Sequence, residues 1–394
     1  MSKILYTGII LDNKWTGGEP VVAKNLISYL QNHNWEVFTS YYKPNSYFKK
    51  KLSSLMRQYV SVSDKDKSAV EFYLNEIKRI DPDIIISQYD FDTSVIEAAK
   101  IAGKKMISYI HIWWPTCPKI TLYKSDNSIC DGFMGNDCYS CIMDTVKGKS
   151  KYFLKIMANK NDIKKKMNER IKRLNYDNVY AIVLNNGMRN YFSNYIRKER
   201  IFVINNGINL QEFNYYEGNR EKIVSYLGGQ NEVKGYKIFL KIAEILHDQM
   251  PEVKFFAAGT FSDDLINKYP YVSFLGQINR QKVVKILQES RCTVFPSLFK
   301  EPFGLIVLES SACGTPVVAS GIDTIQEMFK NGEDIFIAKR GDANDFASKI
   351  KMILNDDILF KKVSKNARQK VETLFDQQNI YKNFEILLKK IIES

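Results

Sequence analysis

Two glutamates, Glu301 and Glu309, lie in one short segment that has the residues to hold a polar, anionic ligand. Pro302 and Gly304 are typical of a loop, and the apolar run 305–312 has the length of a short helix. A helix that starts at a glycine presents backbone N–H groups and the positive end of its dipole, and both favour an anion such as a diphosphate. Each glutamate can then accept hydrogen bonds from hydroxyl groups beside that anion. The segment predicts a nucleotide-sugar site, although two solvated glutamates in an ordinary βαβ unit are the alternative.

The elements that must position this segment belong to an α/β chain. With 394 residues, the sequence is long enough for two domains of about 200 residues each. Aliphatic strands alternate with helical patterns, which is typical of parallel sheets. We expect strands at 3–10, 35–40, 83–87, 105–110, 179–184, 200–204, 222–227, 253–258, 272–275 and 317–319, and helices at 19–33, 68–80, 93–101, 281–289, 305–312, 342–354, 358–374 and 378–392.

The glutamate segment opens E-P-F-G-L and closes G-T-P-V-V-A-S. It resembles the paired-glutamate motif of retaining GT-B glycosyltransferases, above all glycosyltransferase family 4. The resemblance implies two Rossmann-like domains with parallel sheets facing across a cleft, and a C-terminal helix crossing back to the N-terminal domain. It also implies that Glu301 faces the donor sugar and that Glu309 holds the ribose. The backbone of Phe303, Gly304 and Leu305 would contact sugar and phosphate.

Two features of the first half match the same family. Gly17 and Gly18 follow the first expected strand and resemble the first-loop glycines that approach the donor diphosphate. His111, one of three histidines, follows a strand at the edge where open α/β sheets bind ligands. The family carries a histidine there that faces the donor sugar, whereas a structural histidine beside Trp113 and Trp114 is the alternative.

The loop after the first strand of the second half carries the expected phosphate ligand. Family 4 generally has an arginine and a lysine in this loop, and both neutralise the leaving diphosphate. Lys234 matches the lysine, but Gly229 stands where the arginine is expected. Arg280 or another residue would then have to supply the second charge. Gly259 and Gln277 lie where related enzymes pass backbone around the nucleotide.

The run N-N-G-I-N at 205–209 resembles the interdomain motif of the family, with Asn209 where aspartate is usual. We therefore expect an acceptor-binding Rossmann-like domain at 1–206 with an insertion at 112–150, a nucleotide-sugar-binding domain at 207–376, and a final helix at 377–394 that returns to the first domain.

Four of the six cysteines fall within 25 residues of that insertion, namely Cys117, Cys130, Cys138 and Cys141. Cytosolic clusters of this kind are more often metal sites than disulfides, and four thiolates can close a tetrahedral structural zinc site. Only Cys138 and Cys141 have the standard zinc spacing. Zinc, two disulfides and unmodified thiols therefore all stay open.

The formal net charge of +13 is concentrated in the first half of the chain. Between 147 and 173, nine lysines and two arginines stand against two acidic residues, and a second cluster contains Lys43, Lys49, Lys50, Lys51 and Arg57. The segment 150–174 also carries apolar residues at helical spacing, which is typical of a helix on anionic lipid. A solvated helix packed on its own domain is the alternative. No recognised nucleic-acid module accompanies the charge, so we expect no nucleic-acid partner.

These observations predict a retaining glycosyltransferase that moves a hexose-type sugar from a UDP- or GDP-sugar to a glycan or lipid-linked saccharide acceptor. His111, Lys234 and Glu301 are the expected catalytic residues, and the family's mechanism needs no metal ion or cofactor for catalysis. No apolar run has the length of a bilayer span, and the first residues lead into a strand. We expect a cytoplasmic protein, peripheral at the inner face of the membrane. A GT-B epimerase or phosphorylase, and a non-catalytic nucleotide-sugar- or nucleic-acid-binding protein, are the alternatives.

Overall fold

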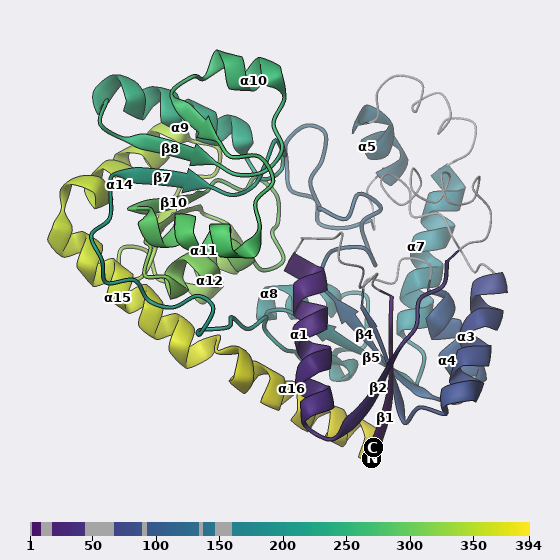
Figure 1. Cartoon of the computed structure of the whole chain (residues 1–394). Coiled ribbons are helices and arrows are strands. Elements are labelled where there is room, and N and C mark those ends of the chain that lie inside the picture. Colours follow the sequence, from purple (N-terminus) through teal and green to yellow (C-terminus); the bar gives the residue numbers. More distant parts are fainter. Residues whose placement is uncertain (1, 9–17, 44–66, 89–92, 134–136, 146–159) are drawn as a thin grey trace. The chain divides into compact units, whose positions relative to one another are not determined.

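The computed structural model describes residues 2–8, 18–43, 67–88, 93–133, 137–145 and 160–394 (Figure 1). The chain divides into two compact units. Unit 1 comprises Met1–Asn205 and Tyr381–Ser394, and unit 2 comprises Asn206–Ile380. Each unit has its own parallel sheet, so each is described separately.

Unit 1 is built on a six-stranded sheet of parallel strands in the order β2-β1-β3-β4-β5-β6. Parallel strands need crossover helices, which cover both faces of the sheet, and this explains why the inner strands β3 and β4 are almost wholly buried. The strands are β1 (Ser2–Thr7), β2 (Trp35–Thr39), β3 (Ile84–Gln88), β4 (Lys105–Ile110), β5 (Val179–Val183) and β6 (Ile201–Val203). The helices are α1 (Gly18–Asn32), α3 (Lys67–Ile80), α4 (Ser94–Ile101), α5 (Cys138–Thr145), α7 (Lys160–Leu174), α8 (Asn186–Phe192) and the 3₁₀ helix η1 (Lys198–Arg200).

Helix α7 turns its apolar side inward. Ile163, Met167 and Leu174 are buried, and α7 contacts α4, α5 and β5. Arg170 and Arg173 are buried as well, and Arg170 donates to the backbone carbonyl of Trp114 at 2.8 Å. For the described half of the segment 150–174, the structure therefore favours a helix packed on its own domain. The remainder of that segment up to residue 159, and the basic residues Lys49, Lys50, Lys51 and Arg57, lie outside the described residues.

The C-terminal helix α16 (Gln377–Glu393) begins in unit 2, and its residues from Tyr381 onward belong to unit 1. Glu385 accepts a hydrogen bond from the indole nitrogen of Trp35 at 3.3 Å. Lys105 donates to the carbonyls of Ile391 and Ile392 at 3.0 and 2.9 Å, where a cation complements the negative end of the helix dipole. The expected return of the last helix to the first domain is thus present.

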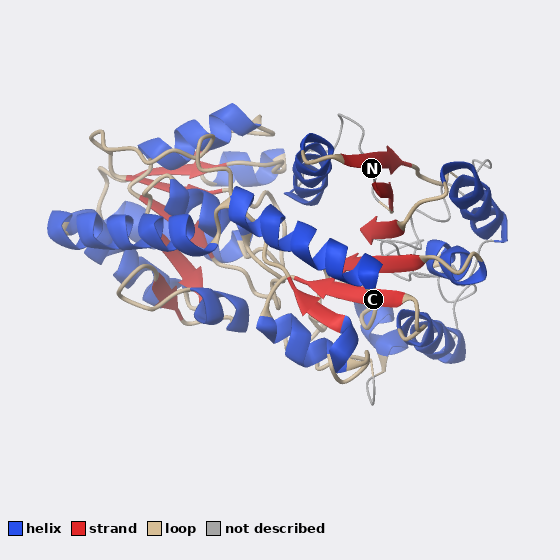
Figure 2. Ribbon diagram, turned by 90° about the horizontal axis from the view of Figure 1, so that it is seen from below, coloured by secondary structure: helices blue, strands red, loops and turns tan. Residues whose placement is uncertain are grey.

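Unit 2 has a second six-stranded parallel sheet, in the order β12-β11-β10-β7-β8-β9. In both units the strands gather in the middle with helices around them (Figure 2). The strands of unit 2 are β7 (Ile223–Tyr226), β8 (Lys254–Ala257), β9 (Val272–Phe274), β10 (Cys292–Phe295), β11 (Val317–Ser320) and β12 (Phe336–Ala338). Its helices are α9 (Tyr236–Gln249), α10 (Asp263–Lys268), α11 (Arg280–Glu289), α12 (Leu305–Ala312), α13 (Asp323–Met328), α14 (Ala343–Asn355) and α15 (Asp357–Leu374).

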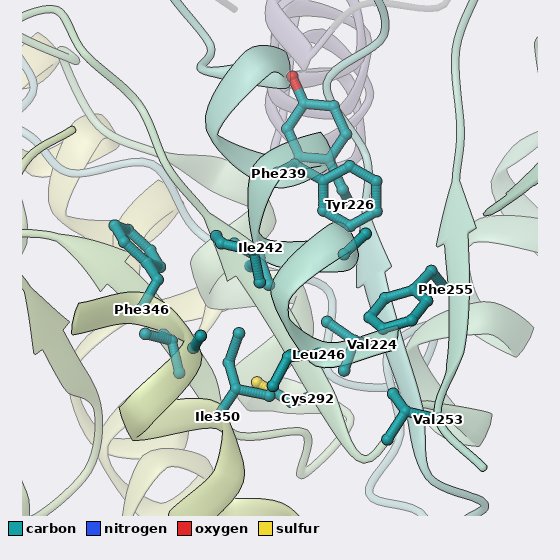
Figure 3. Close-up of a cluster of buried hydrophobic side chains, with 14 of the residues drawn as sticks. Val224, Tyr226, Phe239, Ile242, Leu246, Val253, Phe255, Cys292, Phe346 and Ile350 are labelled. Atoms are coloured by element: carbon teal, nitrogen blue, oxygen red, sulfur yellow. The ribbon is translucent and has the colours of Figure 1, made fainter. Parts of the chain in front are cut away.

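Helices α9 and α14 pack on the sheet of unit 2 and form its core. Phe239, Ile242 and Leu246 of α9 follow helical spacing and gather with Phe255 of β8 and Ile350 of α14 (Figure 3). Full burial of each such side chain contributes about 1.5 to 3 kcal/mol. This core holds β7, β8 and β10 in register, so the loops that leave these strands start from fixed positions.

The predicted α/β class with two parallel sheets is confirmed. Among the described helices, none combines the length and the hydropathy needed to cross a bilayer. The elements that the sequence did not predict include α9, β10 and β12. The two strands have only four and three residues. Helix α9 has 14 residues with buried side chains at helical spacing, so its periodic signal was available in the sequence.

Candidate active site

The strand order of unit 2 reverses beside β7. From β7 the chain moves outward to β8 and β9, then returns to β10 on the other side of β7 and continues to β11 and β12. In open α/β sheets, ligands bind at the carboxyl ends of the strands where the order reverses. The loops that follow β7 and β10 therefore define the candidate site.

These two loops bring Lys234 and Glu301 together. The Nζ atom of Lys234 donates to Oε1 of Glu301 at 2.9 Å, and Oγ of Ser297 donates to Oε2 at 3.1 Å. The Glu301 side chain is 9% exposed and that of Lys234 is 37% exposed. The carboxylate is thus fixed from both oxygens, while the ammonium group remains reachable from solvent. A positioned and accessible cation suits an anionic ligand.

Lys234 is held there because the two loops touch. Gly235 has φ +79°, and a Cβ atom at this position would lie 1.9 Å from the carbonyl oxygen of Pro296. The backbone N–H of Leu298 donates to the carbonyl of Val233 at 2.8 Å. Only glycine combines this conformation with such a close approach, so Gly235 sets the distance between the loops.

Helix α12 begins at the same edge of the sheet. Its N-cap, Gly304, has φ +85° and no described side chain caps it. The N–H groups of the first turn and the positive dipole end are therefore available for an anion. The ring of Phe303 is buried, with its centroid 6.0 Å from that of Phe375. The Phe303 ring is thus used in packing, which leaves its backbone as the part that could reach a ligand.

Glu309, further along α12, belongs to a three-residue charge network. Nη1 of Arg280 donates to Glu309 at 3.0 Å, and Nε of Arg280 donates to Glu212 at 2.7 Å. Burial raises the pKa of Glu309, and the nearby arginine acts in the opposite direction. Arg280 is thus engaged by two carboxylates. It positions Glu309 and is not placed as a substitute for the arginine expected at position 229.

The loops after β7, β8 and β9 also meet. A Cβ atom on Gly259 would lie 2.4 Å from the Cα atom of Gly229, and the N–H of Gly229 donates to the carbonyl of Ala258 at 3.0 Å. Gln277 donates from its side chain to Thr260 at 3.1 Å. Gly229 has φ +61°, which L-residues rarely adopt. This conformation is a physical reason for glycine, in place of arginine, at position 229.

His111 lies in unit 1, directly after β4, and is 3% exposed. Burial lowers its pKa to about 3, so the imidazole is neutral at pH 7. Its Nε2 atom has no hydrogen-bond partner among the described residues. A neutral ring with one unpaired nitrogen can exchange one hydrogen bond with a ligand. Of the first-loop glycines, Gly18 begins α1, and Gly17 lies outside the described residues.

The four clustered cysteines line one cavity of about 200 Å³ in unit 1. None of the six cysteines, all of which are described, forms a disulfide. Burial raises the pKa of Cys138 to about 12 and also raises the pKa values of Cys117 and Cys130. These neutral thiols are poor nucleophiles. In the described ranges no group of three His, Cys, Asp or Glu residues is arranged to hold a metal ion.

Sequence reasoning missed two residues that shape the candidate site. Ser297 precedes Glu301 by four positions, and this short spacing within one loop was an available signal for a contact. Glu212 lies 68 positions from Arg280, and no local pattern links the two. A contact between residues so far apart in the sequence can be identified only from the folded structure.

Comparison with known proteins finds a family match within unit 2. Residues 209–370 match the family model described as glycosyl transferases group 1. Over 273 residues the chain is 23% identical to the capsular polysaccharide biosynthesis glycosyltransferase CapM of Staphylococcus aureus, and the match covers 64% of this chain and 68% of that protein.

Two solved structures resemble the whole chain. Sucrose-phosphate synthase from Thermosynechococcus elongatus has a TM-score of 0.70 and 18% identity, with 100% of both chains covered. HepE of Anabaena, in complex with UDP and glucose, has a TM-score of 0.66 and 15% identity, covering 99% of this chain and 100% of that one. At these identities the likeness defines the fold, which is GT-B. The fold, the group 1 match and the relatives together support a GT-B glycosyltransferase.

The contact between the two loops predicts an unequal response to two glycine substitutions. Gly235→Ala should destabilise the protein more than Gly332→Ala, because Gly332 shares a positive φ of +76° but has nothing within 4 Å of its added Cβ. The control should lose about 1 to 2 kcal/mol for its backbone conformation alone. Urea midpoints of the two variants measure the difference. Equal losses would contradict the close approach at Gly235.

Proposed function

We propose that this chain is a retaining glycosyltransferase of the family 4 type. It transfers a hexose-type sugar from a UDP- or GDP-sugar to a saccharide or lipid-linked saccharide, in polysaccharide, glycolipid or protein-glycan assembly. The observation that carries this proposal is the contact of Lys234 with Glu301 beside the start of α12, at the reversal of the strand order. The UDP complex of HepE supports a UDP donor, and CapM supports polysaccharide assembly.

The chemical demand at this site is the stabilisation of negative charge. When the bond between the anomeric carbon and the phosphate oxygen breaks, its electron pair stays on the departing diphosphate. Once the diphosphate is bound, the ammonium group of Lys234 and the N–H groups at the start of α12 stabilise that charge, and this stabilisation is worth most where water is excluded. A diphosphate also competes with Glu301 for Lys234. Binding therefore releases a carboxylate oxygen of Glu301 to accept hydrogen bonds from sugar hydroxyls.

Glu309 accepts hydrogen bonds from the ribose hydroxyls in this proposal. Arg280 occupies one of its oxygens, at 3.0 Å, and offsets the cost of burying the charge. An ionised carboxylate is an acceptor only, so the second oxygen suits a diol. Arg280 contributes to donor binding through Glu309, as a positioning residue.

Retention follows if the acceptor hydroxyl attacks on the face that the diphosphate leaves. The leaving phosphate then takes the proton of the acceptor hydroxyl, and the new glycosidic bond keeps the configuration of the anomeric carbon. No residue of the chain serves as a nucleophile in this scheme. His111 has in this proposal the role that the family resemblance implies, facing the donor sugar.

The proposal is tested by a thermal-shift screen of UDP, GDP, ADP and dTDP. A ligand that binds only the folded state stabilises it, by about 2.7 kcal/mol when the free ligand is at a hundred times its Kd. This stabilisation raises the apparent melting temperature. We expect UDP or GDP to raise it. No response to any of the four nucleotides would contradict a nucleotide-sugar donor.

The two glutamates should respond differently to truncation. Glu309→Ala removes a charged acceptor for ribose and should weaken nucleoside diphosphate binding by about 1.5 to 3 kcal/mol, roughly ten- to hundredfold. Glu301→Ala should leave that affinity nearly unchanged and lower turnover. Calorimetry of both variants with UDP gives the comparison. The reverse pattern would mean that the roles of the two residues are exchanged.

Lys234→Ala should reduce turnover more than it weakens binding, because the charge is needed as the diphosphate departs. Loss of one such electrostatic contact typically costs a factor of about 100 to 1000 in kcat. Lys237→Ala is the matched control, since Lys237 pairs with Glu232 at 2.6 Å and is well exposed. Wild-type turnover in Lys234→Ala would show that a cation other than Lys234 carries this role.

We also infer that the acceptor is membrane-associated, on the cytoplasmic leaflet. Among the described residues, the support for membrane binding is electrostatic. Lys164, Lys165 and Lys172 of α7 are exposed, while the apolar side of that helix is buried. Lysines near an anionic surface gain about 1 kcal/mol each. Binding of the protein to the membrane should therefore require anionic lipid and weaken as the salt concentration rises.

Co-sedimentation with anionic and neutral liposomes tests this inference. Replacing Lys164, Lys165 and Lys172 with glutamine should weaken binding to anionic liposomes by up to about a hundredfold. The matched control replaces Lys361, Lys362 and Lys365, three exposed lysines of α15 in unit 2, and should bind like the wild type. Equal binding to anionic and neutral liposomes, or no binding to either, would favour a soluble acceptor.

A further inference from the structure

The four clustered cysteines come from three segments that meet at one cavity. Cys138 and Cys141 stand three residues apart at the start of α5 and so share a helix face. The N–H of Cys130 donates to the carbonyl of Leu122 at 2.8 Å, and the N–H of Leu122 approaches Sγ of Cys117 at 3.4 Å. Leu122 thus ties the Cys117 and Cys130 segments together. All four cysteines line the same cavity, which is open to solvent and gives an ion a path of entry.

Hydrogen-bond donors lie beside three of the four sulfur atoms, and the thiol of Cys130 also donates to the carbonyl of Gly132 at 3.3 Å. Besides the N–H of Leu122 at Cys117, the N–H of Gly132 lies 3.4 Å from Sγ of Cys130, and Nζ of Lys119 lies 3.6 Å from Sγ of Cys141. Gly132 has φ +114°, and a Cβ atom there would lie 2.1 Å from Oη of Tyr195. Glycine is therefore required at the residue whose N–H faces Cys130. Neutral thiol sulfur is a weak acceptor, whereas thiolates bound to a metal rely on such donors.

The charges around the cavity fit a thiolate site. Four thiolates and one Zn²⁺ carry a net charge of −2, and Lys119 and Lys124 line the cavity. Three aspartates also line it, but each is engaged by a nearby serine. Asp126 accepts from Ser128 at 2.9 Å, Asp137 from Ser140 at 3.1 Å and Asp144 from Ser125 at 3.3 Å. The sulfurs are consequently the ligand set that the cavity offers.

We propose that Cys117, Cys130, Cys138 and Cys141 bind one zinc ion as a structural tetrathiolate site. Among the described residues, no three such side chains already form a group that could hold a metal ion, so this proposal requires the thiols to turn toward the cavity when zinc binds. Four sulfur ligands in tetrahedral geometry select zinc. Two disulfides would leave Lys119 and the N–H donors facing uncharged sulfur. The site lies in unit 1 and is independent of the proposed glycosyl transfer.

Elemental analysis of the purified full-length chain tests the site directly. We expect about one zinc per chain, and Cys138→Ser should lose both the zinc and thermal stability. Cys138→His should keep the metal, because an imidazole nitrogen also ligates zinc. Cys292→Ser is the matched control, since Cys292 is a buried thiol of β10 in unit 2 and its loss should leave the zinc content unchanged.

A second measurement keeps the proposal testable if Cys138→Ser fails to fold. Wild-type protein stripped with a chelator and titrated with Co²⁺ should develop the visible absorption of tetrahedral cobalt thiolate, and Zn²⁺ should displace it. Four thiols should resist a thiol reagent until the metal is removed. Protein that contains iron or no metal after growth with zinc, or whose intact mass shows two disulfides, would overturn the proposal. Neither result would bear on nucleotide binding.

Discussion

The ion pair between Lys234 and Glu301 is the interaction on which the candidate site depends. It joins two loops that leave neighbouring strands of the sheet, at the point where the strand order reverses. The pair exists only because Gly235 allows the first loop to touch the second at Pro296. The reversal of the strand order places the site, and Gly235 permits the close approach of the two loops. Lys234 is therefore in position before a ligand binds.

The buried core of unit 2 is what makes this placement rigid. The loops after β7 and β10 start from strands that α9 and α14 cover, so this packing fixes the points where both loops begin. Within the site, both oxygens of Glu301 are hydrogen-bonded, and Glu309 is paired with Arg280. Buried charges are tolerated when they are satisfied in this way and are costly when they are not. The polar residues of the site are therefore also part of its structural support.

Much of the fold was predictable from the sequence, because long aliphatic strands and amphipathic helices carry a strong periodic signal. Helix α12 was predicted with its observed ends, since glycine precedes it and Cys313-Gly314 follows. Lys234 and Glu301 were predicted as site residues from motif resemblance, while their direct contact was not. Contacts such as that of Glu212 with Arg280 join distant positions, and no sequence period reports them. The inward packing of α7 was also not predictable, because the same amphipathic pattern suits a domain core and a lipid surface.

A crystal structure of the protein with UDP tests the central claim most directly. We expect the diphosphate oxygens within hydrogen-bond distance of Nζ of Lys234 and of the N–H groups in the first turn of α12, with the ribose hydroxyls at Glu309. Lys234 should exchange part of its contact with Glu301 for the phosphate. A UDP molecule that binds elsewhere, with the Lys234–Glu301 pair unchanged, would contradict the assignment of this edge of the sheet as the donor site.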